Sequence, residues 1–245
     1  LGLKIMIGSA LLTVLGFALM LPVFGAFAKK RWWSLLFVLF STISLINAHV
    51  HSDYSKGKAK PNSLIYLLNT DTKKAFWTTY DQNLDEWTKT YLGENPVDAK
   101  ALNTDKLYSK YGSTFTFMKD APVMNVPQPS IEFIADSVMG ATHYYKIKIT
   151  PNRKVNRYDL FANETLEIAN LKANNVSAID IKSNIISKKT NKILSYYVVD
   201  NLPLTLEFSI PVSQNLDMHL MESSFDLLKN PLFSIRERAD WMIAT

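Results

Sequence analysis

The chain has 245 residues, of which 47% are hydrophobic and 20% charged, an ordinary composition for one or two folded domains. It contains no cysteine, which excludes a disulfide scaffold and any thiolate metal site. The net charge of +5 is unevenly distributed, because residues 1–50 hold four basic and no acidic residues. Removing these four leaves 23 basic and 22 acidic residues in 51–245, so the polar part has no basic excess and no nucleic-acid partner is expected.

Residues 1–50 contain two apolar stretches. Ile5 to Ala28 runs for 24 residues without a charge, long enough to cross a hydrocarbon core of about 30 Å. Pro22 is expected to kink this span or end it early. A basic turn, 29–31, is followed by Trp32-Trp33 and an uncharged stretch to Val50. The pattern predicts a hairpin of two transmembrane helices, about 5–28 and 32–50, with membrane lipid as a partner.

The positive-inside rule places the turn 29–31 in the cytoplasm and everything after His51 on the exported side, periplasmic or lumenal. The alternative is a signal peptide, with the basic turn as its n-region, Trp33–Ser44 as its apolar region and cleavage near Ala48. A complete apolar span precedes the basic turn, which favours the hairpin. Both interpretations predict export of the polar part.

Residues 51–61 are polar, with alternating lysines and a closing proline, and are interpreted as a linker. Residues 62–245 are interpreted as one exported, mainly β domain, because their short β-branched and aromatic stretches alternate with period two. This spacing indicates an antiparallel β-sandwich or jelly-roll-like domain. The predicted strands are Ser63–Leu68, Ala75–Tyr80, Thr114–Met118, Ile131–Ser137, Thr142–Thr150, Tyr158–Ala162, Leu166–Leu171, Ala178–Lys182, Ile193–Val199, Leu204–Ile210 and Met218–Ser223.

One or two short helices interrupt the strands. In the first, Asp81 is predicted as the N-cap, Leu84, Trp87 and Tyr91 share a face, and Gly93 ends the helix. A second, shorter helix is expected around Ser224–Leu228. The chain opens within an apolar run and closes on Trp241–Thr245, which has the pattern of an interrupted strand. We therefore interpret it as a fragment, truncated at its C-terminus.

No glycine-rich phosphate loop, nucleophile elbow or H-E-x-x-H motif occurs. His49, His51 and Asp53 have zinc-ligand spacing on a strand, but a polar membrane exit is the favoured interpretation, because a zinc site needs at least one more ligand and none is obvious nearby. His143 and His219 fall within strand patterns, as packed or surface residues. We therefore predict no catalytic, cofactor-binding or metal-binding residue in this chain.

Three further groups have a functional and a structural interpretation. The carboxylates Asp81, Asp85 and Glu86 suit acid–base catalysis or a helix N-terminus. A basic group suits an anion site or a solvated loop, and an aromatic group suits a sugar platform or a core. In each case the structural interpretation is favoured. The basic group is Arg153, Lys154 and Arg157, and the aromatic group is Trp77, Tyr80, Trp87 and Tyr91. Asn163 and Asn175 begin glycosylation sequons.

Four long stretches resemble, in order, the C-terminal region of membrane-anchored di-zinc exopeptidases, the family of the vacuolar membrane protease and the endoplasmic reticulum metallopeptidase, in its bacterial branch. They are KPNSLIYLLNTDTKKAFWTTYDQNLDEWTKTYLGENP from Lys60, RKVNRYDLFANETLEIANLKANNV from Arg153, LSYYVVDNLPLTLEFSIP from Leu194 and ESSFDLLKNPLFSIRERADWMIAT from Glu222.

The resemblance implies an upstream exported peptidase domain that holds two zinc ions through an H-x-D motif and a paired acidic motif. His51-Ser52-Asp53 is literally H-x-D but lies at the membrane exit, and no Glu-Glu pair occurs in the chain. No catalytic residue is therefore transferred, and zinc is expected only in the upstream domain. The implied role is a membrane anchor with a non-catalytic exported domain that packs near the peptidase domain of an aminopeptidase-like hydrolase and shapes substrate access. The alternative is a stand-alone membrane-anchored module that binds glycans or peptides.

Overall fold

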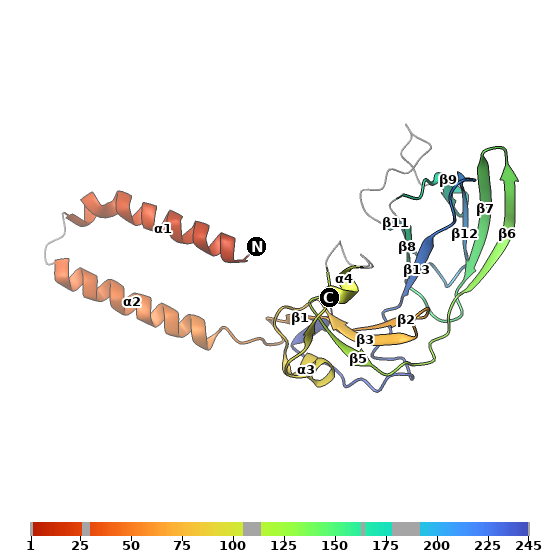
Figure 1. Ribbon diagram of the computed structural model, residues 1–245. Helices are drawn as coiled ribbons and strands as arrows, with labels where there is room; N and C mark the ends of the chain where they lie inside the picture. The colour runs from red at the N-terminus through yellow and green to blue at the C-terminus, as the bar shows by residue number, and fades with distance from the viewer. Residues whose placement is uncertain (1, 26–29, 105–113, 163–164, 178–191, 245) are drawn as a thin grey trace. The chain divides into compact units, whose positions relative to one another are not determined.

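The computed structural model describes residues 2–25, 30–104, 114–162, 165–177 and 192–244. The chain divides into two compact units, Leu1–Ala59 and Lys60–Thr245. The first unit contains the helices α1 and α2, and the second contains all the named strands (Figure 1). The second unit therefore begins two residues before the predicted domain boundary at residue 62, because Lys60 and Pro61 belong to its first strand.

The first unit contains α1, Gly2–Gly25, and α2, Lys30–Val50. Pro22 lies inside α1, which continues to Gly25, so the proline does not end the helix. Within α2, Arg31–Val50 is long and apolar enough to cross a membrane, whereas the comparable stretch among the described side chains of α1 is the shorter Gly8–Val23. One membrane-crossing helix is thus supported by length and composition. The hairpin of two crossing helices stays a prediction.

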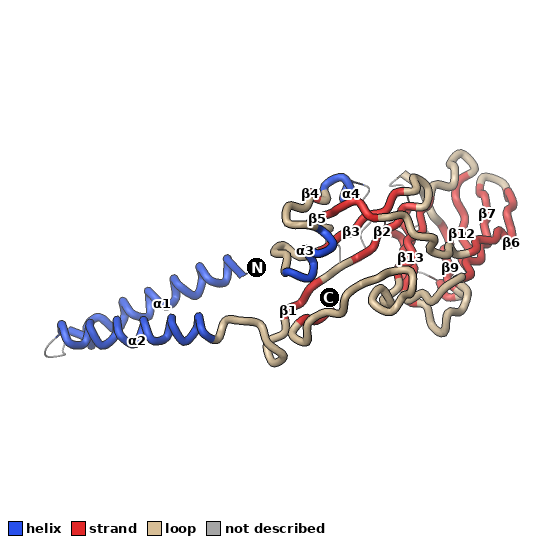
Figure 2. Tube along the Cα trace, turned by 90° about the horizontal axis from the view of Figure 1, so that it is seen from below, coloured by secondary structure: helices blue, strands red, loops and turns tan. Residues whose placement is uncertain are grey.

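The second unit is mainly β and largely antiparallel, as predicted, and its strands form four sheets within the described residues (Figures 1 and 2). Its first part is a four-stranded sheet in the order β2-β3-β5-β4, with helix α3 against β3 and β5. The elements are β2, Ile65–Asn69; β3, Lys74–Thr79; α3, Glu86–Leu92; β4, Val97–Asp98; α4, Lys100–Thr104; and β5, Phe117–Ala121. Strand β1, Lys60–Asn62, pairs in parallel with β14, Met242–Ala244, which joins the two ends of the unit.

The second part of the unit contains a five-stranded and a three-stranded sheet. The first has the order β10-β9-β12-β7-β6 and the second β11-β8-β13. The strands are β6, Ser130–Met139; β7, Thr142–Thr150; β8, Arg157–Ala162; β9, Ala169–Ala173; β10, Val176–Ser177; β11, Lys192–Tyr197; β12, Leu204–Pro211; and β13, Met218–Ser223.

These two sheets contribute to one hydrophobic core, which we call the aliphatic core. In β12, every second residue is fully buried, and the residues between them, which face the other side of the sheet, are half-buried. Buried side chains of β7, β8 and β9 join it, and half-buried ones of β11 and β13 pack against it. Its members include Ile147, Ile149, Tyr158, Leu160, Leu171, Leu204, Leu206, Phe208 and Ile210. Alternation with period two therefore places one face of each sheet in the core. A closed sandwich or jelly roll stays a prediction.

Most predicted strands match the structure within a few residues, and Thr142–Thr150 and Met218–Ser223 match at both ends. Ala178–Lys182 and Asn163 lie outside the described residues. The helix predicted at Ser224–Leu228 is wrong, because this segment forms turns: Lys229 N–H donates to the carbonyl of Asp226, 2.7 Å away, and Phe225 is 75% exposed. Five residues before Pro231 without a buried face cannot offset the cost of starting a helix.

Candidate functional site

The polar residues at the C-terminal end of α2 and directly after it bond to nearby backbone carbonyls. The ring nitrogen Nδ1 of His51 lies 2.9 Å from the carbonyl oxygen of Asn47, and Ser52 Oγ donates to the carbonyl of His49. Lys58 Nζ donates to the carbonyl of His51 at 2.7 Å. Among the described residues, no group of three or more histidine, aspartate or glutamate side chains is placed to hold a metal ion. These contacts fit a helix C-terminus that ends in polar surroundings.

The N-cap of α3 is Asp85, so the prediction that Asp81 caps this helix is wrong. The side chain of Asp85 accepts from Thr88 N–H at 2.9 Å, and Thr88 Oγ1 accepts from Asp85 N–H at 3.0 Å, which completes a capping box. Asp81 instead accepts from the backbone N–H and the hydroxyl of Ser63, both at 3.1 Å. The first helical turn therefore starts four residues later than predicted, where a threonine at the third helical position can reciprocate the cap.

Asp85 also belongs to a buried polar network at the start of the unit. Asn62, which is fully buried, donates to Asp85 at 3.3 Å and accepts from Arg238 Nε at 2.7 Å, and Lys60 lies 3.2 Å from Asp85. Burial raises the pKa of Asp85, but hydrogen bonds from Thr88, Asn62 and Lys60 outweigh it and hold the pKa below its ordinary value. Burial lowers the pKa of Arg238, and the charges of Asp81 and Asp85 oppose this shift. The carboxylate of Asp85 is thus held by Thr88, Asn62 and Lys60, which belong to the same unit.

Five rings form what we call the aromatic cluster: Tyr66, Trp77, Trp87, Tyr91 and Phe233. Trp87 is 6% exposed, donates its indole N–H to the carbonyl of Arg236 at 2.7 Å, and lies beneath the guanidinium of Arg238 at 4.5 Å. Phe233 contacts Tyr66 and Trp77. The prediction that Trp87 is a core residue is confirmed. Because the C-terminal segment packs on these rings, the faces that a sugar would need are largely occupied.

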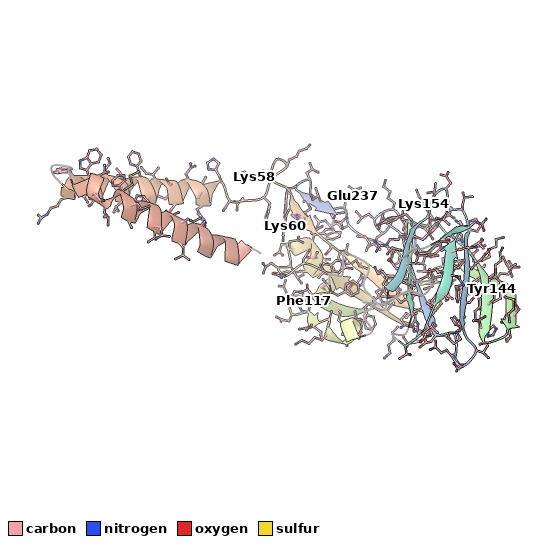
Figure 3. All side chains as sticks on the ribbon, turned by 90° about the horizontal axis from the view of Figure 1, so that it is seen from above. Lys58, Lys60, Phe117, Tyr144, Lys154 and Glu237 are labelled. Atoms are coloured by element: carbon pink, nitrogen blue, oxygen red, sulfur yellow. The ribbon has the colours of Figure 1, made fainter. Side chains whose placement is uncertain are left out.

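The basic group after β7 does not converge on one anion. Arg153 forms an ion pair with Glu222 at 2.5 Å, Arg157 forms one with Asp159 at 2.9 Å, and Lys154 is exposed (Figure 3). Glu222 is 9% exposed at its side chain. Burial raises the pKa of Glu222 despite the opposing charge of Arg153, and burial beside Glu222 raises the pKa of Tyr158. Two of the three predicted cations therefore neutralise buried carboxylates within the fold.

Asp159 is the centre of a second buried ionic cluster. It is fully buried on β8, between Arg157 on the same strand and Lys192 on β11, whose Nζ lies 3.2 Å from its carboxylate. Ser195, directly opposite on β11, donates its hydroxyl to the same carboxylate. The cations also lie over rings, Arg157 over Tyr197 and Lys192 over Phe161. A carboxylate that faces two cations and accepts a hydroxyl hydrogen bond suits a structural link between strands.

Hydrogen-bonded side chains that were not predicted from the sequence connect the two strands of the β6–β7 hairpin. The imidazole of His143 bonds to Asp136 through Nε2 and lies 3.0 Å from the hydroxyl of Tyr145 through Nδ1. Burial and the charge of Asp136 raise the pKa of Tyr145. The hairpin register, which places Asp136 opposite Tyr145 and Val138 opposite His143, puts the three groups on one face. The two predicted strands and the short turn between them already indicated a hairpin in which these residues lie close together. These hydrogen bonds hold the imidazole of His143 between Asp136 and Tyr145.

A shallow hollow of about 250 Å³ lies beside the start of β9, lined by Thr165, Leu166, Gln214, Asn215 and Asp217. Gln214 is fixed there, accepting from Glu167 N–H at 2.8 Å and donating to the carbonyl of Thr165 at 3.1 Å. His219 lies 3.6 Å from Asp217 at its margin. Its lining suits a few hydrogen bonds to a small polar molecule.

Comparison of the chain with protein-family models, with curated proteins and with solved structures found no match.

Proposed function

We propose that the chain is a membrane anchor and a non-catalytic exported domain of a membrane-bound zinc aminopeptidase-like protein, whose peptidase domain precedes it. The domain packs near the peptidase domain and shapes peptide access to it. The proposal rests on the ordered resemblance of four long stretches and on an apolar helix, Arg31–Val50, that is long enough to cross a membrane. On this proposal the five- and three-stranded sheets form a β-sandwich around the aliphatic core.

The main support for a non-catalytic role is that the buried charged groups pair with other groups of the fold. Glu222 pairs with Arg153, Asp159 with Arg157 and Lys192, and Asp85 with Lys60 and the N-terminus of α3. Groups that must exchange protons with a substrate need access and a poised protonation state. These groups are instead committed to holding strands and a helix together, as in a domain whose surface, rather than its interior, performs the function.

The test is the coding frame upstream of Leu1. A zinc peptidase domain with an H-x-D motif and a paired acidic motif in the same frame supports the proposal, and a complete frame without one contradicts it. A variant of the parent protein that lacks residues 60–245 is then expected to keep its zinc but to change its preference for peptide length. Unchanged length preference would remove the role in substrate access.

Membrane topology is tested separately. A reporter fused after Pro61 is expected to be active only on the exported side, because the basic turn 29–31 favours the cytoplasm. Neutral substitution of Lys29, Lys30 and Arg31 is expected to weaken this orientation. A reporter active only in the cytoplasm would reverse the proposed topology.

A further inference from the structure

Strand β6 is a long, apolar edge strand. It is the outermost strand of the five-stranded sheet, and Figure 1 shows it beside β7. Its ten residues carry no lysine, arginine or proline, and five apolar side chains are about half exposed or more: Ile131 53%, Phe133 52%, Ile134 49%, Val138 58% and Met139 60%. The opposite edge, β10, has only two residues. Edges of folded proteins are normally short, covered or protected by lysine or proline, so the length and apolar exposure of β6 are features of a pairing surface.

The exposed apolar side chains lie mainly on the core side of the sheet. Ile131 is opposite Ile149, Phe133 opposite Ile147 and Val138 opposite His143 in the β6–β7 register. Opposed residues of an antiparallel pair share a face, and Ile147 and Ile149 belong to the aliphatic core. The three β6 side chains therefore continue the core beyond β7 and remain exposed among the described residues. We call these three side chains the apolar ledge.

A β-bulge lies at the centre of β6. Phe133 is opposite Ile147 and Ala135 is opposite Lys146, so Ile134 is the extra residue. Before the bulge, odd-numbered residues face the core side, and after it even-numbered residues, Asp136 and Val138, do so. The bulge thus reverses the facing pattern midway along the strand.

This reversal makes β6 complementary to itself. When two copies pair antiparallel over all ten residues, Ser130 lies opposite Met139 of the other copy and Ile131 opposite Val138. In a regular strand these partners have opposite parity and would face opposite sides of the sheet. With the bulge at the midpoint, Ile131 and Val138 face the same side, and so do Phe133 and Asp136.

The charges of β6 agree with the same register. Its two charged residues are Glu132 and Asp136, which then lie opposite Ser137 and Phe133 of the other copy. A shift by one residue in either direction would place residues opposite each other whose side chains face different sides of the sheet, as for Glu132 and Asp136 in one of the two shifted registers. The full-length register places the apolar ledges of both copies on one side of the joined sheet, with Asp136 of each copy opposite Phe133 of the other.

We propose that two copies of this chain associate through antiparallel pairing of their β6 strands, with Ile131 of one copy opposite Val138 of the other. The five-stranded sheets of the two copies become one ten-stranded sheet. Ile131 of each copy is buried against Val138 of the other, and the outward backbone groups of β6 become hydrogen-bonded. This inference is independent of the proposed membership of a peptidase.

Cysteine cross-linking tests the register, because the chain contains no cysteine of its own. The experiment uses the full chain in lipid vesicles, with Ile131→Cys and Val138→Cys combined. Directly opposed residues have Cα atoms about 4.5–5.5 Å apart, within the range for a disulfide. Mild oxidation is expected to convert most of the protein to a covalent dimer on a non-reducing gel.

Three controls make the result specific. Ile131→Cys alone and Val138→Cys alone are expected to give no dimer, since each residue lies seven positions, about 23 Å, from its own counterpart in the other copy. The combination of Ile131→Cys with Ser137→Cys is expected to cross-link at least fivefold less, because these side chains face opposite sides. Adding Phe133→Lys to the matched pair is expected to reduce the covalent dimer at least fivefold.

The proposed register would be overturned if Ile131→Cys with Ser137→Cys cross-linked as well as Ile131→Cys with Val138→Cys. A covalent dimer formed by either single variant would also overturn it. A chain that stays monomeric by mass measurement in nanodiscs, with no cross-link from the matched pair, would overturn association through β6. In that case the exposed strand β6 would pair with a partner of a different sequence.

Discussion

The two parts of the second unit are held together in different ways. The aliphatic core is built from alternating apolar residues of long strands, such as Leu204, Leu206, Phe208 and Ile210, each at most 1% exposed. The aromatic cluster instead depends on directional groups: a capped helix, an indole hydrogen bond and a guanidinium over a ring. Burial of apolar area is tolerant of exact geometry, whereas hydrogen bonds and caps are not. Substitutions in the two regions are therefore expected to fail in different ways.

The largest expected effect is at Trp87. Trp87→Ala should lower the free energy of unfolding by about 3–5 kcal/mol, comparable to Phe208→Ala in the aliphatic core. Trp87→Phe should recover most of the packing and leave a loss of about 1 kcal/mol from the hydrogen bond to Arg236. Urea unfolding of the full chain in detergent, followed by near-ultraviolet circular dichroism, measures both. A Trp87→Ala curve matching the unsubstituted chain would remove this ring from the core and restore the sugar-platform interpretation.

The next effect is expected at Asp159, because its removal leaves Arg157 and Lys192 without their shared carboxylate. Asp159→Asn preserves the shape and should cost roughly 3 kcal/mol. Glu167→Gln, at an exposed carboxylate near β9, is the matched control and should change stability by less than about 0.5 kcal/mol. The same unfolding measurement applies. Similar small losses in both variants would show that the ionic cluster contributes little to holding β8 and β11 together.

A smaller, pH-dependent effect is expected at the cap of α3. Asp85→Ala should cost about 0.5–2 kcal/mol at pH 7. Since the pKa of Asp85 is lowered in the fold, its contribution is present above the unfolded value of about 3.9 and is lost as the pH falls through the folded value. The difference between Asp85→Ala and the unsubstituted chain should therefore shrink below pH 4. Glu86→Ala, one residue later and exposed, is the control. A difference that stays constant down to pH 2 would contradict the ionised cap.

The smallest effect at neutral pH is expected for Tyr158→Phe, which should change stability by no more than about 1 kcal/mol at pH 7. The difference is expected in alkaline solution. Burial raises the pKa of Tyr158, so its contribution is complete below the unfolded value of about 10 and is lost as the pH rises toward the folded value. Stability of the unsubstituted chain should then fall more steeply above pH 10 than that of Tyr158→Phe. Parallel curves between pH 8 and 11 would contradict this assignment.

The strands that form the aliphatic core were largely predictable from the sequence. In β7, Tyr144 to Ile149 alternates without interruption, and both ends of the strand were predicted correctly. The facing residues of a strand repeat every two positions regardless of its neighbours, so local pattern suffices. The contacts of the candidate site residues were less predictable from the sequence. Asp136 and His143 were both visible, but their contact depends on the register of the hairpin.

The sequence by itself determined the apolar N-terminal helices, the mainly β character of the second unit and the positions of its long strands, because each depends on composition and periodicity within one segment. Only the tertiary structure decided which polar groups meet. Asn62 and Arg238 are 176 residues apart, and Trp87 and Arg236 are 149 residues apart. The three-residue strands β1 and β14 are too short to carry a pattern, and the bulge at Ile134 becomes visible only against β7. Such contacts depend on how the chain closes on itself, which local propensity does not encode.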